Sequence, residues 1–233
     1  MSWKNRMNTM QSVKSLKILI LLSWLAIILA HYFALIAAPT ERTMGDIQRI
    51  FYFHVPSAWV SFLAFFIVCV ASIQYLRRGE PSWDTLARTA AELGILFITL
   101  VLLTGPLWAK PVWNTFWTWD ARLTTSFILW LTYIAYLMLR GYTLDPERGA
   151  RFAAVFGIIG FVNVPLVYMS IRWWRTLHPA PVIGEGGGGG LAPGMIFPFI
   201  FALFAFTLLF ITLLILRYRA NTLERCIKEI KSR

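Results

Sequence analysis

The run MIFPFIFALFAFTLLFITLLIL, residues 195–216, contains no charged side chain in 22 residues. A helix needs about 20 predominantly apolar residues to cross the hydrocarbon core of a bilayer, so this run predicts a membrane-spanning helix. The whole chain has the same character, because 58% of its 233 residues are hydrophobic and 14% are charged. About a quarter of the residues of a typical soluble domain are charged. The composition therefore excludes an ordinary soluble protein.

Five other apolar stretches approach or exceed the length that a spanning helix needs. Together they predict spans at about residues 18–38, 57–76, 89–107, 121–139, 152–170 and 195–216. We therefore predict an all-α polytopic membrane protein with six transmembrane helices, forming a single integral membrane domain over residues 1–233. Proline lacks the backbone N–H that a helix interior uses. The prolines expected at or just outside helix ends are Pro39, Pro56, Pro106 and Pro111.

Lysine and arginine are distributed unequally between the two sets of connecting segments. Sixteen lie before the first predicted span, after the second, between the fourth and fifth, and after the last, whereas six lie in the other three loops. Because cytoplasmic segments carry the excess of basic residues, we predict that both termini are cytoplasmic and that these three loops are outside. The net charge of +11 follows from this distribution. Its spread along the chain indicates contact with membrane lipid and not with nucleic acid.

Tryptophan is unusually frequent, with 11 residues in the chain. The three outer loops and their ends hold seven of them, namely Trp59, Trp108, Trp113, Trp117, Trp119, Trp173 and Trp174. Aromatic belts mark both interfaces of a membrane protein. The inner side here has only Trp3 and Trp83. This asymmetry favours a functional aromatic surface on the outer face.

The middle outer loop, residues 108–122, reads WAKPVWNTFWTWDAR. If the chain is helical after Pro111, Trp113, Trp117 and Asp120 share one face, because they are spaced four and three residues apart. Such a loop is expected to lie in the interface with its rings pointing outward. The alternative interpretation is a belt segment that packs only against lipid and helix ends.

Two histidines flank this loop in the predicted topology. His54 precedes the second span and has Arg49 nearby, and His178 follows the fifth span and has Arg172 or Arg175 nearby. Neutral imidazole is a ligand of haem iron, and two imidazoles complete its axial positions. Indole faces and arginine side chains are the groups that hold an aromatic macrocycle with two carboxylates. The alternative is that each histidine is an ordinary hydrogen-bonded interfacial residue.

Three motifs resemble, in the same order, those of the CcmC family, the haem exporter protein C group of haem-handling "WWD" membrane proteins of cytochrome c maturation. They are FHVPSAW at 53–59, WTWDARLT at 117–124 and WWRTLH at 173–178. The resemblance covers the six-span layout and nearly the whole chain. It implies that His54 and His178 are the axial ligands of haem b, bound non-covalently and transiently. It also implies that the loop is a haem platform built from Trp113, Trp117, Trp119 and Asp120, and that Arg49 and Arg122 neutralise the propionates.

The resemblance further implies a location in the bacterial inner membrane, with the functional loops in the periplasm. Haem is then expected to pass to a CcmE-type chaperone, beside an ABC transporter formed by CcmA and CcmB and the small partner CcmD. The chain has no G-x-x-x-x-G-K-[ST] motif, so ATP hydrolysis has to come from such a partner. We therefore do not expect the chain itself to be an enzyme.

The chain departs from the family pattern at two positions of the loop. Asn114 replaces a glycine, and asparagine adopts left-handed backbone angles more readily than most residues, so we expect the turn to be preserved. Phe116 replaces a tryptophan and keeps a ring for stacking. Pro179 favours an extended backbone at His178 itself, and the later run of Glu185 followed by five glycines predicts a flexible tether.

Two alternative functions stay open at this point. A b-type cytochrome would bind haem between histidines within the bilayer, but the spans contain only His31, which we expect to hydrogen-bond between helices. A cytochrome c synthetase would continue the loop with a Pro-x-Glu type sequence, where this chain has Ala121 and Arg122. Two further polar residues of the spans, Glu92 and Asn163, are costly in lipid and are expected to face the helix bundle.

Overall fold

The computed structural model describes residues 3–142, 145–174, 176–178 and 190–231, and this part of the chain contains helices and loops but no β-sheet. The elements are α1 (Trp3–Tyr32), the π-helical turn η1 (Phe33–Ala37), the 3-10 turn η2 (Asp46–Ile50), α2 (Phe51–Arg78), α3 (Pro81–Trp113), α4 (Ala121–Tyr142), α5 (Pro146–Phe161), α6 (Asn163–Trp173) and α7 (Pro193–Lys231). Six segments of the described residues are long and apolar enough to cross a membrane. The prediction of six helical spans is confirmed.

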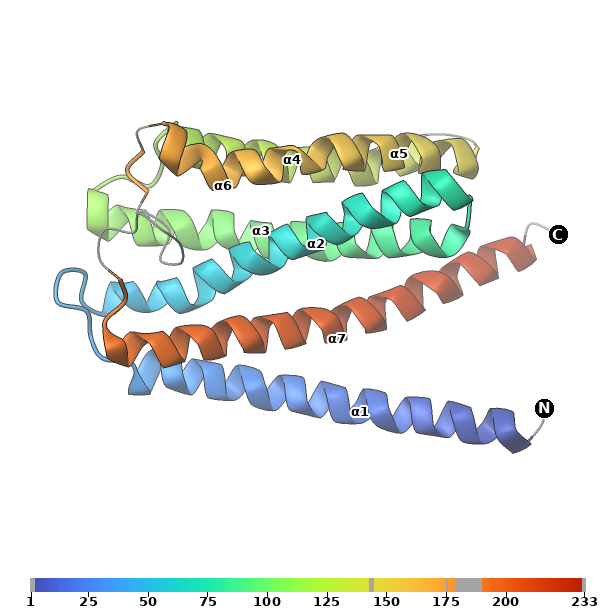
Figure 1. Cartoon of the computed structure of the whole chain (residues 1–233), viewed down its shortest axis with the longest axis horizontal. Coiled ribbons are helices and arrows are strands. Elements are labelled where there is room, and N and C mark those ends of the chain that lie inside the picture. Colours follow the sequence, from blue (N-terminus) through green and yellow to red (C-terminus); the bar gives the residue numbers. More distant parts are fainter. Residues whose placement is uncertain (1–2, 143–144, 175, 179–189, 232–233) are drawn as a thin grey trace.

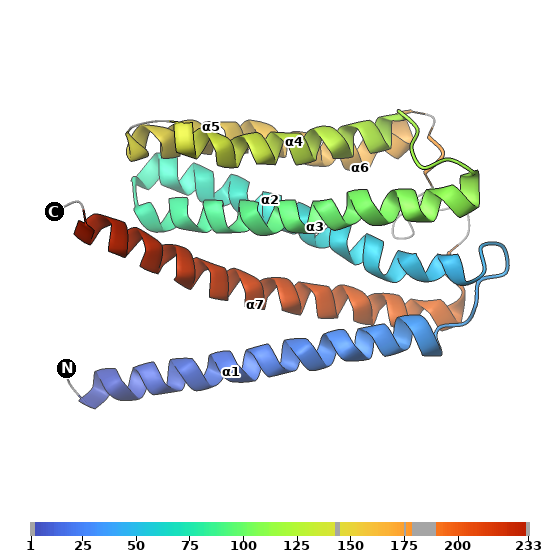
Figure 2. The same cartoon turned by 180° about the vertical axis from the view of Figure 1, so that it is seen from behind.

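The helices lie side by side in three layers (Figure 1). The pair α1 and α7 forms one side, α2 and α3 the middle, and α4 with the nearly collinear α5 and α6 the other side. The start of α1 and the end of α7 lie at the same end of the bundle (Figure 2). The segments that follow η1, α3 and α6 lie together at the opposite end. The described parts of the three predicted outer loops therefore share one end, and its assignment to the periplasm stays a prediction.

Close packing between α2 and α3 sets the middle layer. Helices in a membrane associate through van der Waals contact, which small residues allow by letting backbones approach. At Gly94 of α3, a Cβ atom would lie 2.5 Å from Cε1 of Phe65 on α2. Phe65 in turn stacks on Tyr133 of α4, with ring centroids 3.7 Å apart and planes 11° apart. One phenyl ring thus joins the three helices α2, α3 and α4.

Polar residues within the spans are used for packing, as expected. The Glu92 carboxylate on α3 accepts hydrogen bonds from Arg217 Nε at 2.6 Å and from Asn221 Nδ2 at 3.2 Å, both on α7. The Asn163 amide on α6 donates to the Thr125 carbonyl oxygen on α4 at 3.0 Å. Both groups face neighbouring helices, which confirms their predicted orientation.

The predicted positions of the prolines are only partly right. Pro39 lies just beyond η1, but Pro56 lies within α2, and Pro106 and Pro111 lie within α3. Membrane-spanning helices tolerate internal prolines because surrounding groups satisfy the freed backbone carbonyls. The residue that ends α3 is Asn114, whose φ of 57° and ψ of 19° place it in the left-handed region. The turn expected at this asparagine is therefore present.

The helices extend beyond the predicted spans, and the fifth and sixth spans show differences that the sequence explains. The fifth is split into α5 and α6, because Pro165 has no N–H to donate to the Phe161 carbonyl, and its ring clashes with that group in a regular helix. The sixth continues well past residue 216, to Lys231, since residues 217–231 contain neither glycine nor proline.

Candidate functional site

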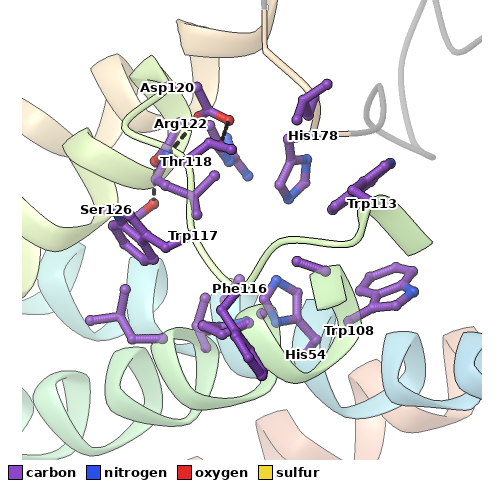
Figure 3. Close-up of a pocket in the computed structure, with 18 of the residues that line it drawn as sticks. His54, Trp108, Trp113, Phe116, Trp117, Thr118, Asp120, Arg122, Ser126 and His178 are labelled. Atoms are coloured by element: carbon purple, nitrogen blue, oxygen red, sulfur yellow. Dashed lines mark hydrogen bonds between the residues drawn. The ribbon is translucent and has the colours of Figure 1, made fainter. Parts of the chain in front are cut away.

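A cavity of about 880 Å³, including its open mouth, lies at the loop end between α2, α3, α4 and residues 114–120 (Figure 3). Six of the eight predicted site residues line it, namely His54, Trp113, Trp117, Asp120, Arg122 and His178. The fold thus brings three segments that are distant in the sequence to one cavity.

His54 is held in the cavity wall by α3. Its side chain is buried, and its Nδ1 lies 2.9 Å from Thr104 Oγ1. Its ring meets Trp108 edge to face, with centroids 5.9 Å apart and planes 72° apart. Thr104 and Trp108 both belong to α3, whereas His54 belongs to α2. The orientation of this imidazole is therefore set by the contact of α2 with α3.

His178 reaches the cavity from the segment that follows α6, and Figure 3 shows it on the side opposite His54. Its backbone N–H donates to Thr176 Oγ1 at 3.1 Å, and the adjacent Leu177 also lines the cavity. The described residues do not include Arg175, Pro179 or residues 185–189, so the expectations for these residues stay predictions. The two predicted iron ligands are therefore presented to one cavity from different elements.

The tryptophan loop is not helical, which corrects the predicted arrangement of its side chains. Because α3 ends at Trp113, residues 114–120 follow an irregular path and Trp113, Trp117 and Asp120 do not share a helix face. Lys110 Nζ donates to the backbone carbonyl and the side-chain oxygen of Asn114, at 3.1 Å each, and so stabilises the helix end. The irregular path nevertheless directs all three side chains to the cavity.

Two aromatic residues of the loop have different surroundings. Trp119 lies outside the cavity wall with 74% of its surface exposed, and it contacts Trp117 edge to face at a centroid distance of 5.7 Å. Phe127 of α4 contacts both indoles in the same way. Trp119 therefore braces Trp117 from outside. Phe116, which replaces the expected tryptophan, does line the cavity.

The charged residues of the loop also have structural partners. The Asp120 carboxylate accepts hydrogen bonds from the Leu123 backbone N–H at 3.1 Å and from Thr118 Oγ1 at 2.9 Å, so it caps the start of α4. Arg122 donates to the Val167 carbonyl oxygen on α6 while lining the cavity. This bond holds a guanidinium in the cavity wall.

Arg49 lies away from the cavity, although it was predicted to neutralise a propionate. Its guanidinium donates to the carbonyl oxygens of Ala34 at 2.9 Å and Ala38 at 3.3 Å, and it pairs with Asp46 at 3.1 Å. These bonds connect η1 to η2 and position the chain that enters α2.

Several further placements were not foreseen. Trp108, Thr104 and Gly105 support His54, and only Trp108 carried a sequence signal, as part of the tryptophan-rich run. Trp59 donates to Thr207 on α7 at 3.2 Å and so faces away from the cavity. His31 is bonded to the Ile27 carbonyl oxygen of its own helix at 2.7 Å, so the predicted bond between helices is wrong.

The donor set fits a flat aromatic ligand that carries its own metal. Within the described ranges, no three His, Cys, Asp or Glu side chains are grouped so that they could hold a metal ion by themselves. Two imidazoles match the axial positions of an iron whose other four ligands come from a macrocycle. The surrounding indole and phenyl rings match the macrocycle, and Arg122 matches a carboxylate substituent.

Comparison with known proteins gives the family. The family model described as "Heme exporter protein C" (CcmC) matches residues 2–233. A "Heme exporter protein C" of Bradyrhizobium diazoefficiens is 38% identical over 194 residues, which are 83% of this chain and 74% of the relative. A protein of the same name from Haemophilus influenzae is 34% identical, covering 80% and 76% of the two chains. A "Putative cytochrome c biosynthesis ccmC-like mitochondrial protein" of Marchantia polymorpha is 36% identical, covering 76% and 75%. The chain belongs to the heme exporter protein C family.

Proposed function

We propose that this protein binds haem in the cavity of Figure 3, at the outer face of the bacterial inner membrane, and passes it on for cytochrome c maturation. The observation that carries the proposal is that His54 of α2 and His178, which follows α6, line the same aromatic cavity. The names of the relatives, heme exporter and cytochrome c biosynthesis proteins, agree with this function.

Each part of the cavity has a role in this proposal. His54 and His178 would hold the haem through its iron, which takes imidazole nitrogens as ligands. Trp113 and Trp117 exclude water and contact the macrocycle, and Arg122 pairs with a propionate. The chain has no C-x-x-C-H sequence for covalent attachment of a c-type haem, and the haem of this proposal is of the non-covalent b type.

The two histidines differ in a way that suits transfer. His54 lies on a long helix and is buried against α3, whereas His178 lies on an irregular segment and is only half-buried. Movement of the His178 segment alone would free one axial position while His54 keeps the other. The haem then becomes accessible to an acceptor without any change in the helix bundle.

The acceptor in this proposal is a CcmE-type chaperone that docks at the loop end. The indoles of Trp119 in the loop, Trp173 at the end of α6 and the following Trp174 are exposed, and they offer an apolar contact surface. ATP hydrolysis is assigned to an ABC transporter of CcmA and CcmB with CcmD, because the chain has no phosphate-binding loop of its own.

The test of haem binding is the absorption spectrum of the purified full-length protein in detergent. We expect His54→Ala and His178→Ala each to lose the six-coordinate low-spin spectrum and to retain less haem. His31→Ala is the matched control, because this third histidine is bonded to its own helix and lies outside the cavity lining. Unchanged spectra in both cavity variants would overturn the proposal.

Delivery is tested separately from binding. Haem-loaded protein is mixed with an apo-chaperone of the CcmE type, and the transferred haem is measured in the chaperone fraction. Haem that stays bound through repeated reduction and oxidation indicates a b-type cytochrome instead. Attachment of haem to a C-x-x-C-H apocytochrome by this protein alone indicates a synthetase.

A further inference from the structure

We propose that Thr104 is a positioning residue that fixes the tautomer of His54, so that Nε2 is the nitrogen offered to the haem iron. The inference rests on the proposed function, because it concerns how His54 is prepared as an iron ligand. Thr104 lies on α3, and its hydroxyl is the described hydrogen-bond partner of the His54 ring.

The position of the threonine proton follows from the partners of Oγ1. A hydroxyl has one proton to donate, and it can accept through its lone pairs. Thr104 Oγ1 lies 2.7 Å from the Leu100 carbonyl oxygen, which only accepts, so the proton is used in this bond to the preceding helical turn. The next carbonyl oxygen, that of Val101, is at 3.5 Å and is also only an acceptor.

The imidazole proton follows from the threonine. His54 Nδ1 lies 2.9 Å from the same Oγ1, whose proton is already donated to Leu100. The hydroxyl oxygen therefore accepts, and Nδ1 carries the ring proton. In a neutral imidazole with the proton on Nδ1, the lone pair available to a metal is on Nε2.

The same helical turn also holds the plane of the ring. A Cβ atom at residue 105 would lie 3.4 Å from His54 Cε1, at van der Waals contact distance, so the edge of the imidazole ring packs beside α3 at Gly105. Trp108, one turn after Thr104, meets the ring edge to face. The segment 104–108 of α3 thus sets both the orientation and the protonation of His54.

This support has a measurable effect on a bound iron. An imidazole that donates its other N–H is a more basic ligand, and loss of such an outer partner lowers metal affinity about 10- to 100-fold. A more basic ligand also favours the oxidised iron, so we expect loss of the threonine hydroxyl to raise the midpoint potential of the haem.

The first test needs no haem. Histidine labelled with ¹⁵N in the full-length protein reports the protonation of each ring nitrogen, and comparison with His54→Gln assigns the His54 signals among the three histidines. We expect Nδ1 to be protonated and Nε2 to be unprotonated in the wild type. Thr104→Val should bring in the form protonated on Nε2, and Thr104→Ser, which keeps the hydroxyl, should restore the wild-type spectrum.

Thr132→Val is the matched control. The Thr132 hydroxyl on α4 donates to the Ile128 carbonyl oxygen at 2.8 Å, the same bond to the preceding turn, and it is not part of the cavity lining. This variant should leave the His54 signals unchanged.

The second test uses the haem-loaded protein. Thr104→Val should release haem about 10- to 100-fold more readily and raise its midpoint potential, while Thr104→Ser and Thr132→Val stay close to the wild type. Wild-type His54 protonated on Nε2, or a Thr104→Val spectrum equal to the wild type, overturns the inference. Haem binding itself is tested by the His54→Ala and His178→Ala spectra. If those two variants lose the low-spin spectrum but one of the two contrary Thr104 results is obtained, the role of Thr104 is wrong and the proposed haem site stands.

Discussion

The Asp120 carboxylate accepts the backbone N–H of Leu123 at 3.1 Å, so the residue that closes the tryptophan loop is also the N-terminal cap of α4. The same carboxylate accepts the hydroxyl of Thr118 from within the loop. The conformation of the loop beside Trp117 is therefore coupled to the start of a spanning helix.

Loss of this cap should destabilise the protein and disturb the cavity together. Asp120→Ala should lower the free energy of unfolding by about 0.5–2 kcal/mol, whereas Asp120→Asn keeps an acceptor and should lose less. Thermal unfolding in detergent measures this. Asp145→Ala is the control, since Asp145 caps α5 through Glu147 and Arg148 at the opposite end of the bundle. Asp145→Ala should lose a comparable free energy of unfolding but retain haem. If Asp120→Ala and Asp145→Ala retain haem equally, the conformation of the loop is not coupled to the start of α4.

Arg122 should matter for its shape as well as for its charge. It donates to the Val167 carbonyl and lines the cavity, and lysine cannot reproduce its planar set of donors. Loss of one charge-assisted hydrogen bond of about 1.5 kcal/mol corresponds to roughly tenfold weaker binding. We therefore expect Arg122→Lys to raise the dissociation constant of haem about tenfold, as measured by titration.

The same substitution at Arg140 is the control for Arg122. This arginine lies on the same helix and pairs with Asp84, away from the cavity. Arg140→Lys should affect unfolding and leave haem affinity unchanged. Equal haem affinity of Arg122→Lys and the wild type would remove Arg122 from the binding site.

Gly94 should tolerate no side chain. A Cβ atom added at Gly94 would lie 2.5 Å from the Phe65 ring. Gly94→Ala therefore forces α2 and α3 apart or displaces a ring that is stacked on Tyr133. Overpacking of this kind costs about 1–3 kcal/mol. Gly141→Ala, where an added Cβ has no atom within 4 Å, should be neutral or stabilising. Equal unfolding temperatures of the two variants would contradict the packing described for α2 and α3.

Glu92 should contribute to stability where exposed glutamates do not. It is 18% exposed and receives bonds from Arg217 and Asn221, although Arg217 itself is 47% exposed and partly screened by solvent. Glu92→Gln should therefore lower the free energy of unfolding by about 1–3 kcal/mol. In Glu147→Gln, which removes the solvent-exposed pair with Arg151, the change should stay below about 1 kcal/mol. Matching denaturation curves would show that the bonds to Glu92 do not stabilise the contact between α3 and α7.

Local patterns predicted some features well and others badly. Apolar length predicted six spans, and the tendency of asparagine to adopt left-handed angles predicted the turn at Asn114. The helical spacing proposed for Trp113, Trp117 and Asp120 was wrong, because this turn ends α3 before the loop begins. Pro106 and Pro111 were expected to end the helix, yet a spanning helix accommodates them.

The sequence by itself predicted the six spans and the two groups of loops, and it singled out His54 and His178, whose role as iron ligands stays a prediction. Apolar length, charge distribution and residue type can all be read from the chain without its fold. Tertiary structure alone decided that Arg49 is bonded to η1, that Trp119 points outward and that Thr104 lies beside His54. These outcomes depend on how each helix is rotated and how closely it packs on its neighbours. Such contacts join residues far apart in the chain, so no local pattern specifies them.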